Sequence, residues 1–248
     1  MYEETGIFVA ICRHGFVIIV CDMVRSGELA KYPIAIVNKV QKVYEGRHRL
    51  AGAYDIWCSF KETLNKSTLG PQLKKSGLDG CVPAWHGYAH NRLCQLSNHP
   101  LYREGFGMND FEGCERLFSS TNGVARCTRH ASSRYRHRML CAHFEQWDED
   151  KYHDLSSYLL RHYKEALGRQ TALTAALSKA EALLGVHSSD FDGWLAEEHE
   201  YLQNLVKEPV KNVQDIAYIE LLAKYYQARY VYISMPAGLQ MSPADFAY

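Results

Sequence analysis

The sequence predicts a chain with an α/β first part and an all-helical second part. Short runs rich in β-branched and aromatic residues fall within the first 110 residues, whereas leucines at helical spacing dominate from Tyr152 onward. Strands that come early and helices that come late indicate one domain of mixed structure followed by a helical extension. We place the boundary at residue 150, which gives a first domain over residues 1–150 and an extension over residues 151–248.

Two apolar runs, Gly6–Ile11 and Phe16–Cys21, predict a pair of strands joined by a tight turn at Cys12–Gly15. Because the runs are almost continuously apolar, we expect both strands to be buried on both faces. The next elements are expected to be a helix over Pro33–Tyr44, a strand over Leu50–Ile56 and a helix that continues to Lys74.

A short strand over Cys81–Trp85 is expected to lead into a helix that carries His90 and Cys94 on one face, since these two residues are four apart. Further helices are expected over residues 111–120, 155–184, 191–206 and 213–232, with a break near Pro209 and an irregular tail over residues 236–248.

Composition limits the class of protein. The 248 residues are 47% hydrophobic and 12% aromatic, which is enough apolar material for a folded core. The 28 basic and 28 acidic residues balance, so no overall charge draws the chain to nucleic acid or to an anionic membrane. No apolar run approaches the ~20 residues of a membrane span, and the acidic N-terminus has no signal-peptide pattern. We therefore expect an intracellular protein with no membrane partner, whose eight cysteines are reduced or metal-bound.

Two places in the sequence present carboxylates in a pattern that suits either structure or chemistry. Asp110 is placed to cap a helix, and Glu112 and Glu115 lie three apart on its first turns, where the helix dipole favours negative charge. Binding of a divalent metal is the functional alternative to that capping role. Asp55 ends a predicted strand, where ligands bind in open α/β sheets, but it could equally cap the helix that follows.

Six short motifs stand in order between residues 5 and 140. They are Gly6-Ile7-Phe8, Cys12-Arg13-His14-Gly15, Ser26-Gly27-Glu28-Leu29-Ala30-Lys31-Tyr32, Tyr54-Asp55-Ile56-x-Cys58, His86-Gly87-x-Ala89-His90-Asn91-Arg92-x-Cys94-Gln95 and Gly113-x-Glu115-Arg116-x-x-Ser119. This ordered set resembles the KDZ (Kyakuja–Dileera–Zisupton) transposases, which are eukaryotic mobile-element enzymes abundant in fungi.

The resemblance implies an RNase H-like fold that cuts and joins DNA through a metal-dependent Asp/Asp/Glu triad. By motif, Asp55 matches the second aspartate, and the glutamate is Glu115 or, as the alternative, Glu112. The implied cofactor is Mg²⁺ or Mn²⁺, held by Asp55 and Glu115 in a two-metal site. The implied partners are transposon ends and target DNA, and the implied location is the nucleus.

The first aspartate of the triad should lie on a strand upstream of the Gly6 motif, and the chain starts five residues before that motif. We therefore expect an RNase H-like core without its first strand, and a truncated, inactive transposase remnant with little or no activity. Asp22 follows a predicted strand but belongs to a different motif, so we do not expect it to substitute. The alternative function is a non-catalytic DNA- or chromatin-binding protein derived from a transposase.

Cysteine and histidine gather between residues 79 and 98. Cys81, His86, His90 and Cys94 are ligand types for tetrahedral zinc, and the spacing of His90 and Cys94 favours a shared metal. The alternative is a buried cysteine with histidines that bond to backbone groups or to a substrate phosphate.

One segment is strongly basic. Together with an arginine in the last motif, it supplies the expected DNA contacts: Arg116, Arg126, Arg129, Arg134, Arg136 and Arg138. The alternative is a solvated helix face balanced by the acidic residues 145–150. The leucines from Leu155 to Leu184 are irregular for the heptads of a dimerising coiled coil, so we expect them to pack inside the protein. A homo-oligomer of another kind is left open.

Overall fold

The structure is a computed structural model that describes residues 3–44, 50–205 and 210–234. These residues fall into two units, Met1–His199 and Glu200–Tyr248. The strands are β1 (Glu4–Ile11), β2 (Val17–Val24), β3 (Ala51–Ala53) and β4 (Asp79–Cys81). The helices are α1 (Lys31–Val43), α2 (Trp57–Lys66), α3 (Gly70–Ser76), α4 (Ala84–Gly87), α5 (Arg92–Asn98), the short 3-10 helix η1 (Pro100–Tyr102), α6 (Gly113–Thr128), α7 (Ser133–Leu184), α8 (Ser188–Asn204) and α9 (Val210–Ser234). Within these described ranges, no helix combines the length and the apolar content that a membrane crossing requires.

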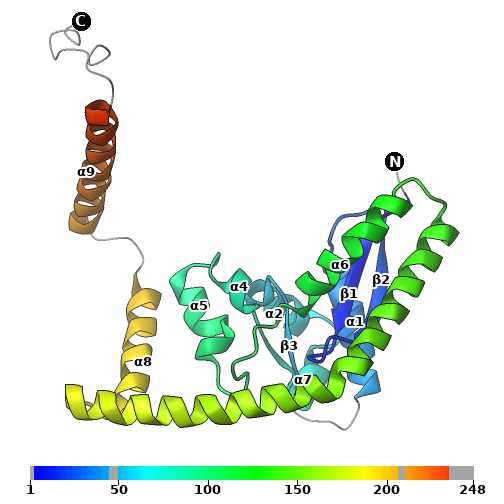
Figure 1. Cartoon of the computed structure of the whole chain (residues 1–248), viewed down its shortest axis with the longest axis horizontal. Coiled ribbons are helices and arrows are strands. Elements are labelled where there is room, and N and C mark those ends of the chain that lie inside the picture. Colours follow the sequence, from blue (N-terminus) through cyan, green and yellow to red (C-terminus); the bar gives the residue numbers. More distant parts are fainter. Residues whose placement is uncertain (1–2, 45–49, 206–209, 235–248) are drawn as a thin grey trace, which may run out of the picture. The chain divides into compact units, whose positions relative to one another are not determined.

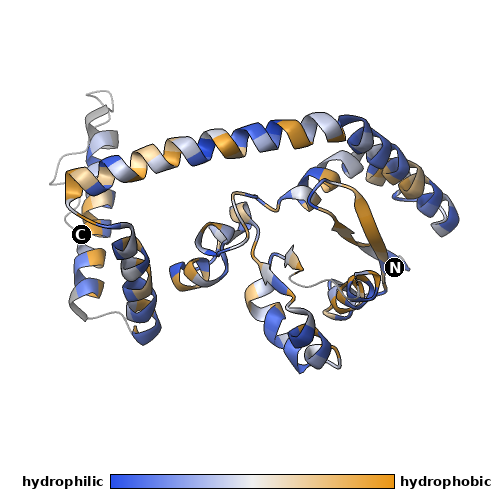
Figure 2. Ribbon diagram, turned by 90° about the horizontal axis from the view of Figure 1, so that it is seen from below, coloured by the Kyte–Doolittle hydropathy of each residue, from blue (hydrophilic) through white to orange (hydrophobic). Residues whose placement is uncertain are grey.

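The predicted hairpin is present. β1 and β2 pair antiparallel, and Figure 2 shows both strands as mainly hydrophobic. Gly15 takes a φ of +94° in the turn, which its lack of a Cβ allows. The expectation of burial on both faces is wrong for β2. Val9 and Val20 are register partners and share a face, yet Val9 is 7% exposed and Val20 is 39% exposed. The reason is that α6 and α7 cover this face over β1 and leave it partly open over β2.

A second sheet consists of β3 and β4, which pair in parallel with Ala53 opposite Cys81. α2 and α3 form the crossover between the strands, and their apolar faces make one core cluster of Trp57, Phe60, Leu64, Leu73 and Val82. β3 is shorter than the expected strand 50–56, and β4 precedes the expected strand 81–85 and overlaps it only at Cys81. The single helix expected up to Lys74 is in fact divided, because Pro71 in the first turn of α3 cannot continue a helix from α2.

The helix expected to carry both His90 and Cys94 is also divided. Asn91 has an extended backbone and caps α5, and its side-chain oxygen accepts the N–H of Cys94 at 2.9 Å. His90 therefore precedes the helix instead of sharing a face with Cys94. The residues expected as a strand from Cys81 onward turn instead into the single-turn helix α4.

The long helix α7 runs through residue 150 without interruption, so the expected domain boundary falls inside one helix. Its first half closes the second core cluster, which joins Val9, Leu117, Leu140 and Phe144. Its second half does not pack as expected. All of its leucines from Leu159 onward are at least 39% exposed: Leu159, Leu160, Leu167, Leu173, Leu177, Leu183 and Leu184. α8 and α9 match the two further predicted helices and begin earlier, while Pro209 and residues 236–248 lie outside the described residues.

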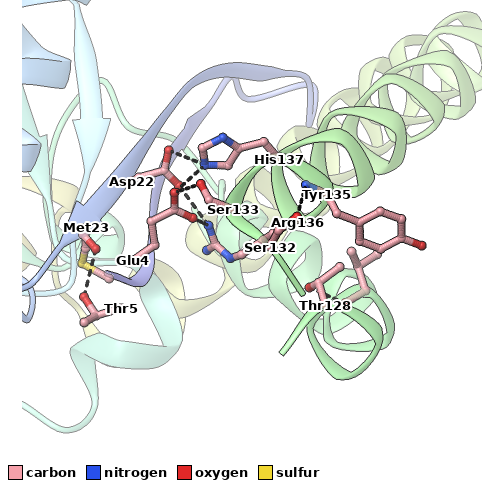
Figure 3. A network of polar contacts seen from close by, with 11 residues as sticks. Glu4, Thr5, Asp22, Met23, Thr128, Ser132, Ser133, Tyr135, Arg136 and His137 are labelled. Atoms are coloured by element: carbon pink, nitrogen blue, oxygen red, sulfur yellow. Dashed lines mark hydrogen bonds and ion pairs between the residues drawn. The ribbon is translucent and has the colours of Figure 1, made fainter. Parts of the chain in front are cut away.

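A charged network fastens the hairpin to the start of α7 (Figure 3). Arg136 donates to Glu4 at 2.6 Å and to Asp22 at 3.1 Å. His137 pairs with the same two carboxylates at 3.0 and 3.2 Å, and Ser133 donates to Glu4. The side chains of Arg136 and Glu4 are only 20% and 12% exposed, so water screens this contact weakly.

Replacing Arg136 with methionine should destabilise the fold by about 1–3 kcal/mol, because it leaves Glu4 and Asp22 without a guanidinium partner. Urea unfolding would measure the loss. Arg134→Met is the matched control, since Arg134 is exposed on the same turn and should change the stability by less than about 0.5 kcal/mol. Equal losses in the two variants would contradict the assignment.

The network also predicts a pH dependence. The hydrogen bond from Ser133 and the charges of His137 and Arg136 hold the pKa of Glu4 below its ordinary value. A carboxylate with a lowered folded pKa stabilises the fold above its unfolded pKa of about 4.3, and this contribution disappears as the pH falls through the folded value. The stability difference between wild type and Glu4→Gln should therefore shrink below about pH 4. A difference that stays constant from pH 7 to pH 3 would exclude this role of Glu4.

Candidate functional site

Asp55 lies where the chain leaves the parallel sheet. The N–H of Tyr54 still bonds to the carbonyl of Cys81, and the N–H of Trp57 turns back to the carbonyl of Tyr54. Asp55 does not cap α2, because the N-cap is Ile56 and no side chain bonds there. Its carboxylate is half exposed and free to meet residues from other segments.

His86 on α4 links the two carboxylate segments. Its Nε2 lies 3.4 Å from Oδ2 of Asp55, and its Nδ1 lies 3.7 Å from Oε2 of Glu112. The Nδ1 atom is buried and has no hydrogen-bond partner within the described residues. A buried polar atom without a partner is costly, so this position indicates a site built to face another group.

The loop before α6 is held by consecutive side-chain turns. Asn109 accepts the N–H of Phe111, and Asp110 accepts the N–H of Glu112, both at 3.1 Å. Phe111 has a φ of +61°, an unusual conformation for a non-glycine residue, and it redirects the chain into the helix. Asp110 was expected to cap α6. It lies instead in the turn before the helix, and the N-cap is Glu112.

The two candidate glutamates have different surroundings. Glu112 accepts the N–H of Trp85 at 2.7 Å and is mostly buried, so it anchors α4 to the start of α6. Glu115 is exposed in the first turn of α6. A Cβ on Gly113 would meet the end of the Ile11 side chain at 2.4 Å, so this turn of α6 packs directly against β1.

These elements bring Asp55, His86 and Glu115 together. One ligand atom from each lies within 4.8 Å of the others, a spacing that suits a shared metal ion. Oxygen from the two carboxylates fits the preference of Mg²⁺ and Mn²⁺, with His86 as a nitrogen neighbour. The residues present therefore fit the divalent cation that the sequence motifs imply.

Electrostatics favour a cation at this position. Partial burial raises the pKa of Asp55, and the nearby negative charges of Glu115 and Glu28 raise it further, while His86 acts in the opposite direction. Glu28 comes from the loop before α1 and accepts the hydroxyl of Tyr54 at 2.7 Å. A group of carboxylates that repel one another is stabilised by a divalent cation more than by its own protein surroundings.

The expected zinc ligands do not come together as one set. Cys58, His90 and Cys94 form a separate cluster, whereas His86 belongs with Asp55 and Glu115. Cys81 lies in neither group of the described residues. It is fully buried, and burial raises the pKa of its thiol to about 12. The four residues Cys81, His86, His90 and Cys94 are thus divided between a core position and two clusters.

The expected DNA-contacting arginines also separate into two kinds. Arg126, Arg129, Arg134 and Arg138 are exposed around the junction of α6 and α7. Arg136 is instead committed to the network with Glu4 and Asp22. Arg116 is exposed but forms a two-pronged ion pair with Asp110 at 2.8 and 3.1 Å.

Two residues at the site were not identified as candidates from the sequence. Glu28 lies inside the motif Ser26–Tyr32 and Cys58 inside the motif Tyr54–Cys58. Their positions in these motifs could have identified them as candidates. Asp22, considered as a substitute for the first aspartate, lies within β2 and pairs with Arg136 and His137, away from the group that contains Asp55.

Comparison with known proteins gives one match. The family model of the Kyakuja-Dileera-Zisupton transposase matches residues 1–148, which include Asp55, His86, Glu112 and Glu115. No curated protein and no solved structure matches the chain significantly.

The charges around Asp55 predict opposite effects of two neighbours on its pKa. Glu115→Gln should lower the pKa of Asp55, because it removes a like charge, and His86→Gln should raise it, because it removes a favourable charge. Carbon-13 NMR of labelled aspartate, with Asp55→Asn to identify the signal, would measure both. Glu62→Gln, an exposed change on α2, serves as the control. Shifts of the same sign in the two test variants would contradict this geometry.

Proposed function

The chain belongs to the Kyakuja-Dileera-Zisupton transposase family, and from this premise we propose that its Asp55–Glu115 cluster contributes two metal-binding carboxylates to a site that cuts and joins DNA strands. The observation that carries the proposal is the convergence of Asp55, His86 and Glu115 from three separate segments onto one position. Convergence of this kind is typical of a site where a cation and a reacting group meet. The cofactor we propose is Mg²⁺ or Mn²⁺.

Asp55 and Glu115 would hold the cation through carboxylate oxygens. When bound, it neutralises charge on a phosphodiester and activates the attacking oxygen. His86 keeps the carboxylate of Asp55 in place through the 3.4 Å ion pair. Glu112 fixes the backbone of Trp85 and thereby the position of His86, so we assign Glu112 a positioning role and Glu115 the metal-binding role.

We also propose an RNase H-like organisation for the first 148 residues. An antiparallel hairpin, a helix, and then two parallel strands joined by helices support this proposal, as does a carboxylate directly after β3. In open α/β sheets, ligands bind beyond the carboxyl ends of the strands, and Asp55 and His86 stand there.

A second candidate function is DNA binding without strand chemistry. It is favoured by the exposed arginines Arg126, Arg129, Arg134 and Arg138, which no described carboxylate neutralises at ion-pair distance. In either function the DNA partner is nuclear.

Strand cleavage tests the first candidate. With Mn²⁺ and a labelled duplex, wild type should cleave or transfer strands, while Asp55→Asn and Glu115→Gln should lose at least about 100-fold in rate. Glu62→Gln is the control and should keep the wild-type rate, because this exposed residue lies on the outer face of α2. If all four proteins behave alike, Asp55 and Glu115 have no role in the chemistry and the second candidate remains.

Salt dependence tests the contact with DNA. Arg134→Ala combined with Arg138→Ala should weaken binding and lower the slope of log affinity against log salt by about two, one for each lost phosphate contact. Arg161→Ala combined with Arg169→Ala is the matched control, since both are exposed further along the same helix. An unchanged slope in the first double variant would remove these arginines from the interface.

A further inference from the structure

We propose that Cys58, His90 and Cys94 bind a zinc ion at a second metal site, distinct from the carboxylate cluster. Cys58 lies in the first turn of α2, His90 in the segment before α5, and Cys94 in the first turn of α5. All three are partly buried, and one ligand atom from each lies within 4.8 Å of the others. Nδ1 of His90 lies 3.7 Å from Sγ of Cys58 and 3.2 Å from Sγ of Cys94.

These separations fit a tetrahedral zinc ion. With Zn–S of about 2.3 Å and Zn–N of about 2.0–2.1 Å, two ligands at the tetrahedral angle place sulfur and nitrogen about 3.6 Å apart. The two measured sulfur–nitrogen distances, 3.7 and 3.2 Å, lie on either side of that value. Small adjustments of side-chain torsions are therefore enough to receive the ion.

The surroundings hold the three ligands in place. The side chain of Asn91 accepts the N–H of Cys94 at 2.9 Å, and the side chain of Gln95 donates to the carbonyl of His90 at 2.8 Å. Asn98 donates to the sulfur of Cys94 at 3.6 Å. A donor directed at a ligand sulfur is the second-layer contact that stabilises a metal-bound thiolate.

The donor set selects the metal. Two thiols and an imidazole suit Zn²⁺ and disfavour Mg²⁺ and Mn²⁺, which prefer oxygen. Among the described residues the cluster supplies three ligands, which leaves the fourth position of a tetrahedral ion open to water. The other exposed cysteines, Cys127 and Cys141, belong to α6 and α7 and join no such group.

Zinc at this position would tie the start of α2 to α5. Cys58 follows Asp55 by three residues, and His90 lies close enough for its charge to act on the pKa of Asp55. The ion would therefore fix the loop that carries Asp55 against the segment that carries His86. Only this last consequence rests on the proposed function; the zinc site itself does not.

The test is metal binding by the full chain, without DNA. Purified under reducing conditions, the wild type should retain about one zinc per chain by elemental mass spectrometry. After zinc removal, Co²⁺ should give the visible bands of a tetrahedral site and a sulfur-to-cobalt charge-transfer band. Cys58→Ser and Cys94→Ser should each weaken metal retention at least about tenfold.

Matched controls separate the site from other cysteines. Cys127→Ser and Cys141→Ser, at exposed positions, should keep the metal, and Cys81→Ala should keep it as well because that thiol lies outside the cluster. The proposal is overturned if wild type binds neither Zn²⁺ nor Co²⁺, a result that needs no variant to fold. It is equally overturned if Cys58→Ser retains the metal as wild type does. Loss of DNA cleavage with intact zinc binding would instead count against the proposed function alone.

Discussion

The parallel pairing of β3 with β4 is the constraint on which the candidate site depends. Because Ala53 lies opposite Cys81, the segments that follow the two strands leave the sheet at the same edge. Asp55 and His86 stand in those segments, and their ion pair is the direct result. α6 adds Glu115 from its first turn, which packs on β1 at Gly113. A change in strand register would separate all three groups.

The net charge of this protein is zero, so electrostatic attraction to a ligand must come from local groups of like charge. Negative charge gathers beyond β3, where partial burial and the charges of Glu115 and Glu28 raise the pKa of Asp55. Exposed positive charge gathers around the junction of α6 and α7, whereas Arg136 is paired with Glu4 in the internal network. A phosphate backbone and a divalent cation would satisfy these two regions separately, without a strong overall field around the molecule.

Sequence patterns predicted the elements that depend on neighbouring residues. The hairpin followed from two apolar runs and Gly15, and the helices of the second half followed from leucine spacing. Patterns failed where distant contacts decide. His90 and Cys94 are four residues apart, which indicated one helix face, but Asn91 caps α5 and leaves His90 before the helix. The ligand sets then separate: His86 turns to Asp55, and Cys58 from another helix replaces Cys81. The exposure of the α7 leucines could not be predicted from their spacing either, because it depends on which other elements pack against the helix.

The two clusters use neighbouring positions in the sequence, since Cys58 follows Asp55 and His90 follows His86. Their donor atoms nevertheless differ. Two carboxylates and an imidazole converge on one position, and two thiols and an imidazole converge on the other. Such sorting matters because zinc outcompetes magnesium at mixed sites, so a cysteine beside Asp55 would capture the wrong ion. Cys114 on α6 lies close enough to Asp55 for their charges to interact, and burial raises the pKa of its thiol to about 11, yet it joins neither ligand group of the described residues. The two donor sets thus favour different cations, since oxygen suits Mg²⁺ or Mn²⁺ and sulfur suits Zn²⁺.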